Sequence, residues 1–122
     1  MKKHLLCIVI LVITIIVVFE CKIVSVYGPS MLPTIKDGDV VIYMSSPNYN
    51  VGDIISFKRI TGEKVVHRIV EKTKRKHDDT YLYITQGDNK KTNKTRDIIK
   101  VRDEDINGKV CIIIPTNVFS KE

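Results

Sequence analysis

The stretch Lys64-Val65-Val66-His67-Arg68-Ile69-Val70 decides the fold class of this chain. Four of its seven residues are β-branched and apolar, and such residues favour a β-strand over a helix. Thr61-Gly62, a turn signal, comes just before it. We therefore expect a strand here that carries a histidine among apolar neighbours.

Four more segments of the same kind lie on either side of this strand, each rich in β-branched or aromatic residues and separated from the next by Gly, Pro, Asn or Asp. They are Val40-Val41-Ile42-Tyr43-Met44, Asp53-Ile54-Ile55-Ser56-Phe57-Lys58, Tyr81-Leu82-Tyr83-Ile84-Thr85 and Gly108-Lys109-Val110-Cys111-Ile112-Ile113-Ile114. No segment after residue 27 repeats its apolar residues at helical spacing. The sequence therefore predicts a mainly β domain built on a small antiparallel sheet.

The N-terminus has a different pattern, because Lys2 and Lys3 precede an uninterrupted apolar run over residues 5–19. The chain contains no alanine, so it has no Ala-x-Ala cleavage site of the kind that ends a secretory leader. Lysines at the ends of such a run extend into the headgroup region. We expect an uncleaved anchor with one transmembrane helix over residues 1–24, and a β-rich domain over residues 25–122. Basic residues ahead of the anchor favour an extracytoplasmic β domain.

The composition excludes several classes of function. The net charge is +6, yet the basic stretches around residues 72–76 and 90–96 contain turn residues and no interleaved aromatics, so we interpret them as solvated loops and expect no nucleic-acid partner. The three cysteines form no C-x-x-C pair and no metal-ligand spacing with the histidines. We expect neither a cofactor nor a metal.

Ser30 is the candidate nucleophile, in the segment Gly28-Pro29-Ser30-Met31-Leu32-Pro33-Thr34. Prolines on both sides stiffen the backbone and favour one exposed position for the hydroxyl. A serine needs a neighbouring base, which near neutral pH is usually histidine. Of the three histidines, His4 precedes the apolar run and His77 lies in a charged loop, which leaves His67. Taken alone, each residue also has an ordinary structural interpretation, Ser30 as a turn hydroxyl and His67 as a half-buried strand residue.

Several motifs in order give these residues further meaning. The anchor is followed by the Ser30 segment, Gly52-Asp53-Ile54-Ile55-Ser56-Phe57, Val65-Val66-His67-Arg68, Thr85-Gln86-Gly87-Asp88-Asn89 and Asp105-Ile106-Asn107-Gly108. The chain in this respect resembles type I signal peptidases. It is most similar to their Ser/His branch, the endoplasmic-reticulum type, because His67 stands where the common bacterial branch has lysine.

The resemblance implies a membrane-bound serine endopeptidase that removes signal peptides from secreted preproteins after a small-x-small sequence. Ser30 would be the nucleophile and His67 the general base. Asp97 and Asp88 would be the supporting acids, with Asp97 favoured for contact with His67 and Asp88 for organising its turn. It implies signal peptides, the lipid bilayer and the secretion translocon as partners, and a cell-membrane location with the catalytic domain outside the cytoplasm.

Position 28 departs from the family pattern, which often has a serine there. Gly28 offers no hydroxyl to the oxyanion hole, so a catalytically silent homologue or accessory subunit that binds signal peptides stays open as an alternative. A second alternative is a Ser/Lys peptidase related to self-cleaving repressors, with Lys64 or Lys72 as the base. The sequence leaves open which preproteins are cut and whether a partner subunit is required.

Overall fold

A computed structural model describes residues 1–118 of the chain. One helix, α1 (Lys2–Phe19), precedes seven strands, and two short 3-10 helices (Asp103–Asp105 and Thr116–Val118) lie near the end. The strands are β1 (Lys22–Ser25), β2 (Val40–Met44), β3 (Ile54–Lys58), β4 (Lys64–Lys74), β5 (Tyr81–Gln86), β6 (Val101–Arg102) and β7 (Ile106–Ile114). The expected mainly β fold is confirmed.

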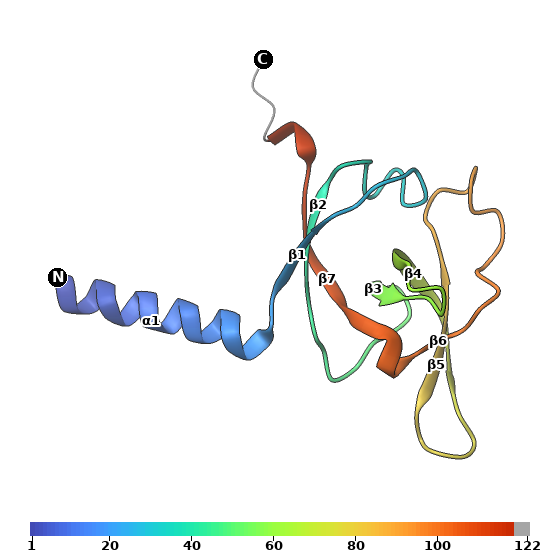
Figure 1. Cartoon of the computed structure of the whole chain (residues 1–122), viewed down its shortest axis with the longest axis horizontal. Coiled ribbons are helices and arrows are strands. Elements are labelled where there is room, and N and C mark those ends of the chain that lie inside the picture. Colours follow the sequence, from blue (N-terminus) through green and yellow to red (C-terminus); the bar gives the residue numbers. More distant parts are fainter. Residues whose placement is uncertain (119–122) are drawn as a thin grey trace.

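All seven strands form one antiparallel sheet in the order β1-β2-β7-β3-β4-β5-β6. The middle run β3-β4-β5 consists of strands joined by hairpins, while β7 returns from the end of the chain and inserts between β2 and β3 (Figure 1). β-Bulges at Ile42/Tyr43 and Ser56/Phe57 shift the register where β7 pairs with its two neighbours. Bulges of this kind bend strands and increase their twist, which lets one sheet curve around its own core.

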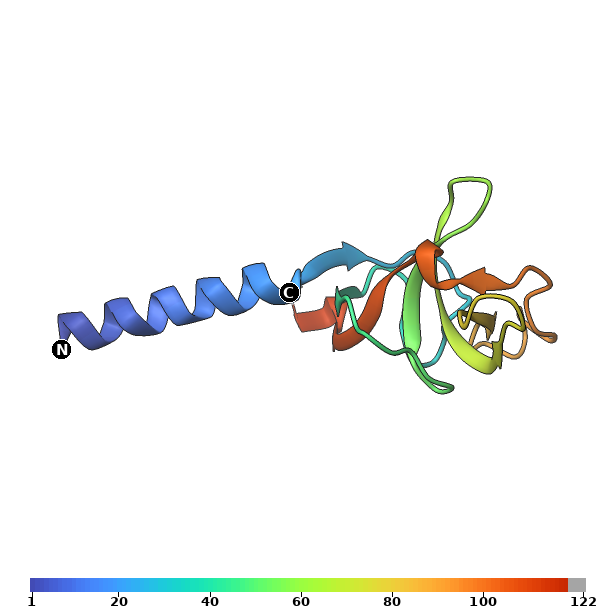
Figure 2. The same cartoon turned by 90° about the horizontal axis from the view of Figure 1, so that it is seen from below.

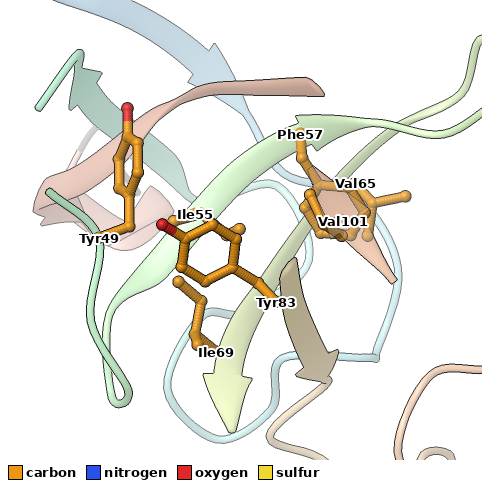
Figure 3. Close-up of a cluster of buried hydrophobic side chains, with 7 residues drawn as sticks. All are labelled: Tyr49, Ile55, Phe57, Val65, Ile69, Tyr83 and Val101. Carbon is orange, nitrogen blue, oxygen red and sulfur yellow. The ribbon is translucent and has the colours of Figure 1, made fainter. Parts of the chain in front are cut away.

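Two apolar clusters fill the two ends of this curved sheet. The first contains Tyr49, Ile55, Phe57, Val65, Ile69, Tyr83 and Val101 (Figure 3). The second contains Val26, Met31, Ile35, Val41 and Ile54. In β4 the residues Val65, His67 and Ile69 are buried while those between them are half-buried, the alternation expected of a strand with one face on a core. His67 therefore points to the same side as the first cluster.

Helix α1 leads away from the sheet and packs on no strand, as both views show (Figures 1 and 2). Its apolar side chains are exposed, from Val9 at 45% to Val17 at 69%. In the part of the chain that the structure describes, no helix is both long enough and apolar enough to cross a membrane.

The expected transmembrane helix over residues 1–24 is corrected accordingly. The helix covers 18 residues, about 27 Å at 1.5 Å per residue, against roughly 30 Å of bilayer hydrocarbon. Residues 22–24, which the sequence assigned to the anchor, instead pair with Tyr43, Ile42 and Val41 of β2. Ile23 and Val24 continue the apolar run in sequence and for that reason resembled a continuation of the helix.

Candidate active site

Ser30 lies in the turn that follows β1, and this turn is fixed to the loop after β5. The Ser30 carbonyl accepts a hydrogen bond from the Asn89 backbone N–H at 2.9 Å, and the Pro29 carbonyl accepts one from Asn89 Nδ2 at 2.9 Å. Met31 is 1% exposed in the second cluster. The buried Met31 and the bonds to Asn89 hold the intervening, half-buried serine in one position.

Gly87 permits this close approach of the two loops. A Cβ atom at this position would overlap the Ser30 carbonyl oxygen and lie 2.8 Å from Cγ of Asn93. Any residue other than glycine would therefore push the Ser30 turn away. Glycine at the first position of the Gly87-Asp88-Asn89 motif is therefore required for the contact between the two loops.

His67 and Asp97 are in direct contact. Nδ1 of His67 lies 2.7 Å from Oδ2 of Asp97, and the hydroxyl of Thr85 donates to the same oxygen at 2.7 Å. The Asp97 backbone N–H donates to the Thr85 carbonyl at 2.8 Å, which fixes the carboxylate on β5. An ionised Asp97 assigns the proton of a neutral imidazole to Nδ1, so Nε2 keeps its lone pair.

The pKa of Asp97 reflects these contacts. Burial raises it, but the hydrogen bonds from His67 and Thr85 and the charge of Arg59 outweigh burial and hold the pKa below the ordinary value. Asp97 therefore stays ionised at neutral pH. A carboxylate in this state orients the imidazole and stabilises the imidazolium that forms when His67 takes a proton.

Asp88 contacts Arg68 and Thr34, and not His67. Its two oxygens accept bonds from Nε and Nη2 of Arg68 at 2.9 and 2.8 Å, and Thr34 Oγ1 donates to it at 2.6 Å. The hydrogen bonds from Arg68 lower the pKa of Asp88 most, and the one from Thr34 lowers it further. Successive strand residues point to opposite faces. Arg68 and the Asp88 bound to it therefore lie on the face of β4 opposite to His67.

This second pair ties the Ser30 turn to the sheet. Thr34 belongs to the turn, Asp88 follows Gly87, and Arg68 also donates to the Gly52 carbonyl at 2.6 Å. Because Arg68 is the neighbour of His67 in β4, one strand holds both the histidine and the support of the serine turn.

The Ser30 and His67 side chains are not hydrogen-bonded to each other. Among residues 1–118 no hydrogen bond joins the Ser30 hydroxyl to any partner, and Nε2 of His67 has none either. The Ser30 backbone N–H is likewise without a partner in this range. The end of β5 connects the two parts of the site. Arg68, the neighbour of His67, pairs with Gln86, and the next residue, Gly87, contacts the Ser30 carbonyl.

The lysines of the Ser/Lys alternative lie outside this arrangement. Lys64 is exposed at the start of β4, opposite Lys58. Lys72 has its Nζ 4.2 Å from the ring centre of Tyr81 and 3.4 Å from Asn50 Oδ1. Neither has a contact with the Ser30 turn in the described part of the chain, so the geometry favours His67 as the base.

A cavity of about 500 Å³ borders the His67–Asp97 pair, with residues 57–61 along one side and 92–102 along the other. Thr85 and Asp97 are among its lining residues, and Asn93, which also lines it, is the residue that meets Gly87. Ser30 and His67 do not themselves line it. The cavity thus adjoins both parts of the site through the residues that support them.

Residues 15–111 of the chain match the family described as Peptidase S24-like. The chain belongs to this family. The membership makes it a serine peptidase domain of the fold that signal peptidases share, which confirms the coarser part of the resemblance. A comparison with curated proteins finds no match. The particular branch, the substrate and the roles of Ser30, His67, Asp97 and Asp88 stay predictions.

Two supporting residues of this S24-like domain were not predicted from the sequence. Thr85 begins the Thr85-Gln86-Gly87-Asp88-Asn89 motif and fixes Asp97, while Arg68 follows His67 and binds Asp88. An arginine beside a histidine inside an apolar strand was the available signal for Arg68. For Thr85 there was no comparable signal, because its partner comes from a distant loop.

Proposed function

We propose that this S24-like domain is a serine endopeptidase of the Ser/His signal-peptidase type, with Ser30 as nucleophile, His67 as general base and Asp97 as the residue that orients it. The observation that carries the proposal is the 2.7 Å contact between His67 Nδ1 and Asp97. It leaves Nε2 as the ring nitrogen that accepts a proton, which is the arrangement a general base needs.

In the proposed reaction His67 Nε2 takes the proton of Ser30 as the hydroxyl oxygen attacks the scissile carbonyl carbon. The Ser30 backbone N–H, which has no partner among residues 1–118, donates to the oxygen that becomes negative. His67 then protonates the leaving amine, and a water activated by the same nitrogen hydrolyses the acyl-enzyme. Catalytic hydrogen bonds are often long in the substrate-free state and shorten in the complex, so we expect substrate to close the gap between Ser30 and His67.

We further propose that the substrates are signal peptides cut after a small-x-small sequence, and that α1 attaches the β domain to the extracytoplasmic face of the bilayer without spanning it. An isolated helix of 18 residues, many of them β-branched, is marginal in water. α1 has apolar side chains exposed all round and Lys2 and Lys3 at its start, a pattern suited to lipid. The lipid bilayer and the translocon are the partners that follow from this placement.

The direct test is cleavage of a reporter preprotein by the full chain in lipid vesicles, with the product N-terminus identified by mass spectrometry. We expect cleavage after a small-x-small sequence, and no cleavage by Ser30→Ala inserted in equal amount. Protease added outside intact, wall-stripped cells should digest the β domain. A product cut elsewhere would overturn the substrate assignment, and a protected domain would overturn the topology.

Two observations favour a second candidate, a signal-peptide-binding homologue without activity. Ser30 and His67 are not bonded, and Gly28 supplies no hydroxyl to the oxyanion hole. The same assay separates the two, because a silent homologue would bind a reporter signal peptide without producing a cleaved N-terminus in wild type.

A further inference from the structure

The cavity beside Asp97 combines apolar and cationic side chains. Three isoleucines on its rim are strongly exposed, Ile60 at 85%, Ile98 at 96% and Ile99 at 58%. Three lysines, Lys58, Lys94 and Lys100, line the same cavity. Exposed large apolar residues gathered around a hollow are typical of a binding site.

Basic residues outnumber acidic ones in the lining of this cavity, which contains three lysines, three arginines and the carboxylates of Glu63, Asp97 and Asp105. Its arginines are paired, Arg59 with Glu63 at 3.1 Å, Arg96 with Glu71 at 2.6 Å and Arg102 with Glu104 at 2.9 Å. Within residues 1–118 the three lysines have no acidic partner and no side-chain hydrogen bond. Their charges are therefore available to a ligand that carries carboxylates.

The place of the cavity in the molecule limits what that ligand can be. Residues 92–100 lie at the end of the β domain away from α1 in both views (Figures 1 and 2). If α1 is in lipid, the apolar part of a signal peptide approaches from the α1 end. The polypeptide on the other side of the scissile bond leads away from the membrane, toward this cavity.

We propose that the cavity binds the first residues of the mature segment of the substrate, and that it selects segments carrying apolar and acidic side chains. The proposal rests on the function proposed above and names the substrate class of the same site. Asp97 contacts His67, and Asn93 meets Gly87, which in turn contacts the Ser30 carbonyl; a chain leaving the nucleophile would pass these residues into the cavity. Its volume of about 500 Å³ accommodates a few side chains.

The first test compares cleavage of three reporter preproteins whose mature segments differ only in carrying two glutamates, two glutamines or two lysines near their start. We expect the acidic reporter to be cut about tenfold faster than the basic one at low salt, since each of its two glutamates contributes modestly through exposed charge pairs. The preference should shrink in 0.5 M salt. The variant Lys58→Gln/Lys94→Gln/Lys100→Gln should lose the preference and cut the acidic and basic reporters at equal rates.

The control variant removes equal charge elsewhere, with Lys36→Gln/Lys74→Gln/Lys76→Gln at exposed positions outside the cavity. It should keep the full preference. If all three reporters are cut equally by wild type, or if the control variant loses the preference as well, the cavity proposal is overturned while the peptidase proposal stands.

A binding experiment tests the cavity proposal even if no reporter is cut. Fluorescein-labelled peptides of equal apolar content with two glutamates or two lysines are titrated against full-chain Ser30→Ala in lipid vesicles. We expect anisotropy to show about tenfold tighter binding of the acidic peptide, lost in the Lys58/Lys94/Lys100 variant. Equal binding of the two peptides overturns the cavity proposal, whereas absent cleavage with selective binding overturns only the catalytic one.

Discussion

At the scale of single residues, β4 separates the two aspartates by pointing His67 and Arg68 to opposite faces. Asp97 contacts the histidine and Asp88 contacts the arginine, so the residues differ in what their removal changes. The family resemblance favoured Asp97 for His67 and Asp88 for its turn, because the family carries acidic residues in and just after the Gly-Asp-Asn motif. That assignment of contacts agrees with the geometry, and the catalytic roles await the following measurements.

We expect Asp97→Asn to keep the fold and to lower turnover by a factor on the order of 10³–10⁴. An amide disturbs the histidine tautomer and does not balance the imidazolium charge. Asp88→Asn should cost about 1 kcal/mol of stability through weaker bonds to Arg68 and Thr34, with less than tenfold loss of turnover. Cleavage rates and melting temperatures of both variants check this. An active Asp97→Asn beside an inactive, fully stable Asp88→Asn would reverse the two roles.

The pH dependence of stability gives a second prediction for Asp97. Its pKa is lower in the folded protein than the ordinary value of about 3.9, so the ionised carboxylate stabilises the fold above that value. The contribution is lost as the pH falls through the lower, folded pKa. Wild type should therefore melt above Asp97→Asn from neutral pH down to about pH 5, and the gap should close in more acid solution. A gap that widens toward low pH would contradict the depressed pKa.

At the scale of elements, the loops after β1 and after β5 form the contact that places Ser30. Gly87→Ala should displace the Ser30 turn, because a Cβ would overlap the Ser30 carbonyl. We expect at least a hundredfold loss of cleavage, the effect of a misplacement of about 1 Å, and a loss of about 1–3 kcal/mol of stability.

Gly62→Ala is the control for this change. Gly62 has φ +90°, and a Cβ added there would lie 4.0 Å from its nearest neighbour, Lys58 Cε, so alanine is strained there without contacting the Ser30 turn or the His67–Asp97 pair. It should lower the melting temperature and leave cleavage unchanged. Equal loss of cleavage in both variants would mean that the Gly87 effect is general destabilisation.

The sequence was informative for elements whose pattern is local. β2, β3, β4, β5 and β7 lie within a few residues of the expected strands, because β-branched runs bounded by Gly, Asn and Asp identify strands without knowledge of their partners. β1 was missed since its apolar residues continue the α1 pattern. β6 has two residues and depends on pairing with Leu82 and Tyr83, which no local pattern indicates.

The sequence likewise predicted only those residues of the candidate site that lie in local motifs. Ser30 and His67 lie in short motifs that a reader finds directly, but Asp97 reaches His67 only because the segment after β5 folds back on Thr85. The Arg68–Asp88–Thr34 contacts and the cavity depend on the same long-range folding. Such contacts follow from the assembled sheet and not from spacing in the chain.

At the scale of the whole molecule, an apolar helix projects from a β domain with a net positive charge. We expect the full chain to float with lipid vesicles in a density gradient. Leu11→Lys/Ile15→Lys should reduce flotation strongly, because a lysine placed among the apolar residues by which a helix contacts lipid is costly.

The matched control is Ile60→Lys/Ile98→Lys, which places two lysines at isoleucines that are at least as exposed but belong to the β domain. Both residues line the cavity beside Asp97 and do not belong to α1, so flotation should be unchanged. If the control variant fails to float while the α1 variant still does, the β domain and not α1 attaches the protein to lipid.

The central claim is that Ser30 and His67 act as one catalytic unit, and a double-variant comparison of reporter cleavage tests it most directly. Single-turnover rates are measured for wild type, Ser30→Ala, His67→Ala and the double variant in vesicles, with melting temperatures recorded for each. The account predicts that each single variant loses a factor on the order of 10⁴ or more and that the double variant is no slower than either. Near-wild-type cleavage by either single variant, or losses that multiply in the double variant, would contradict it.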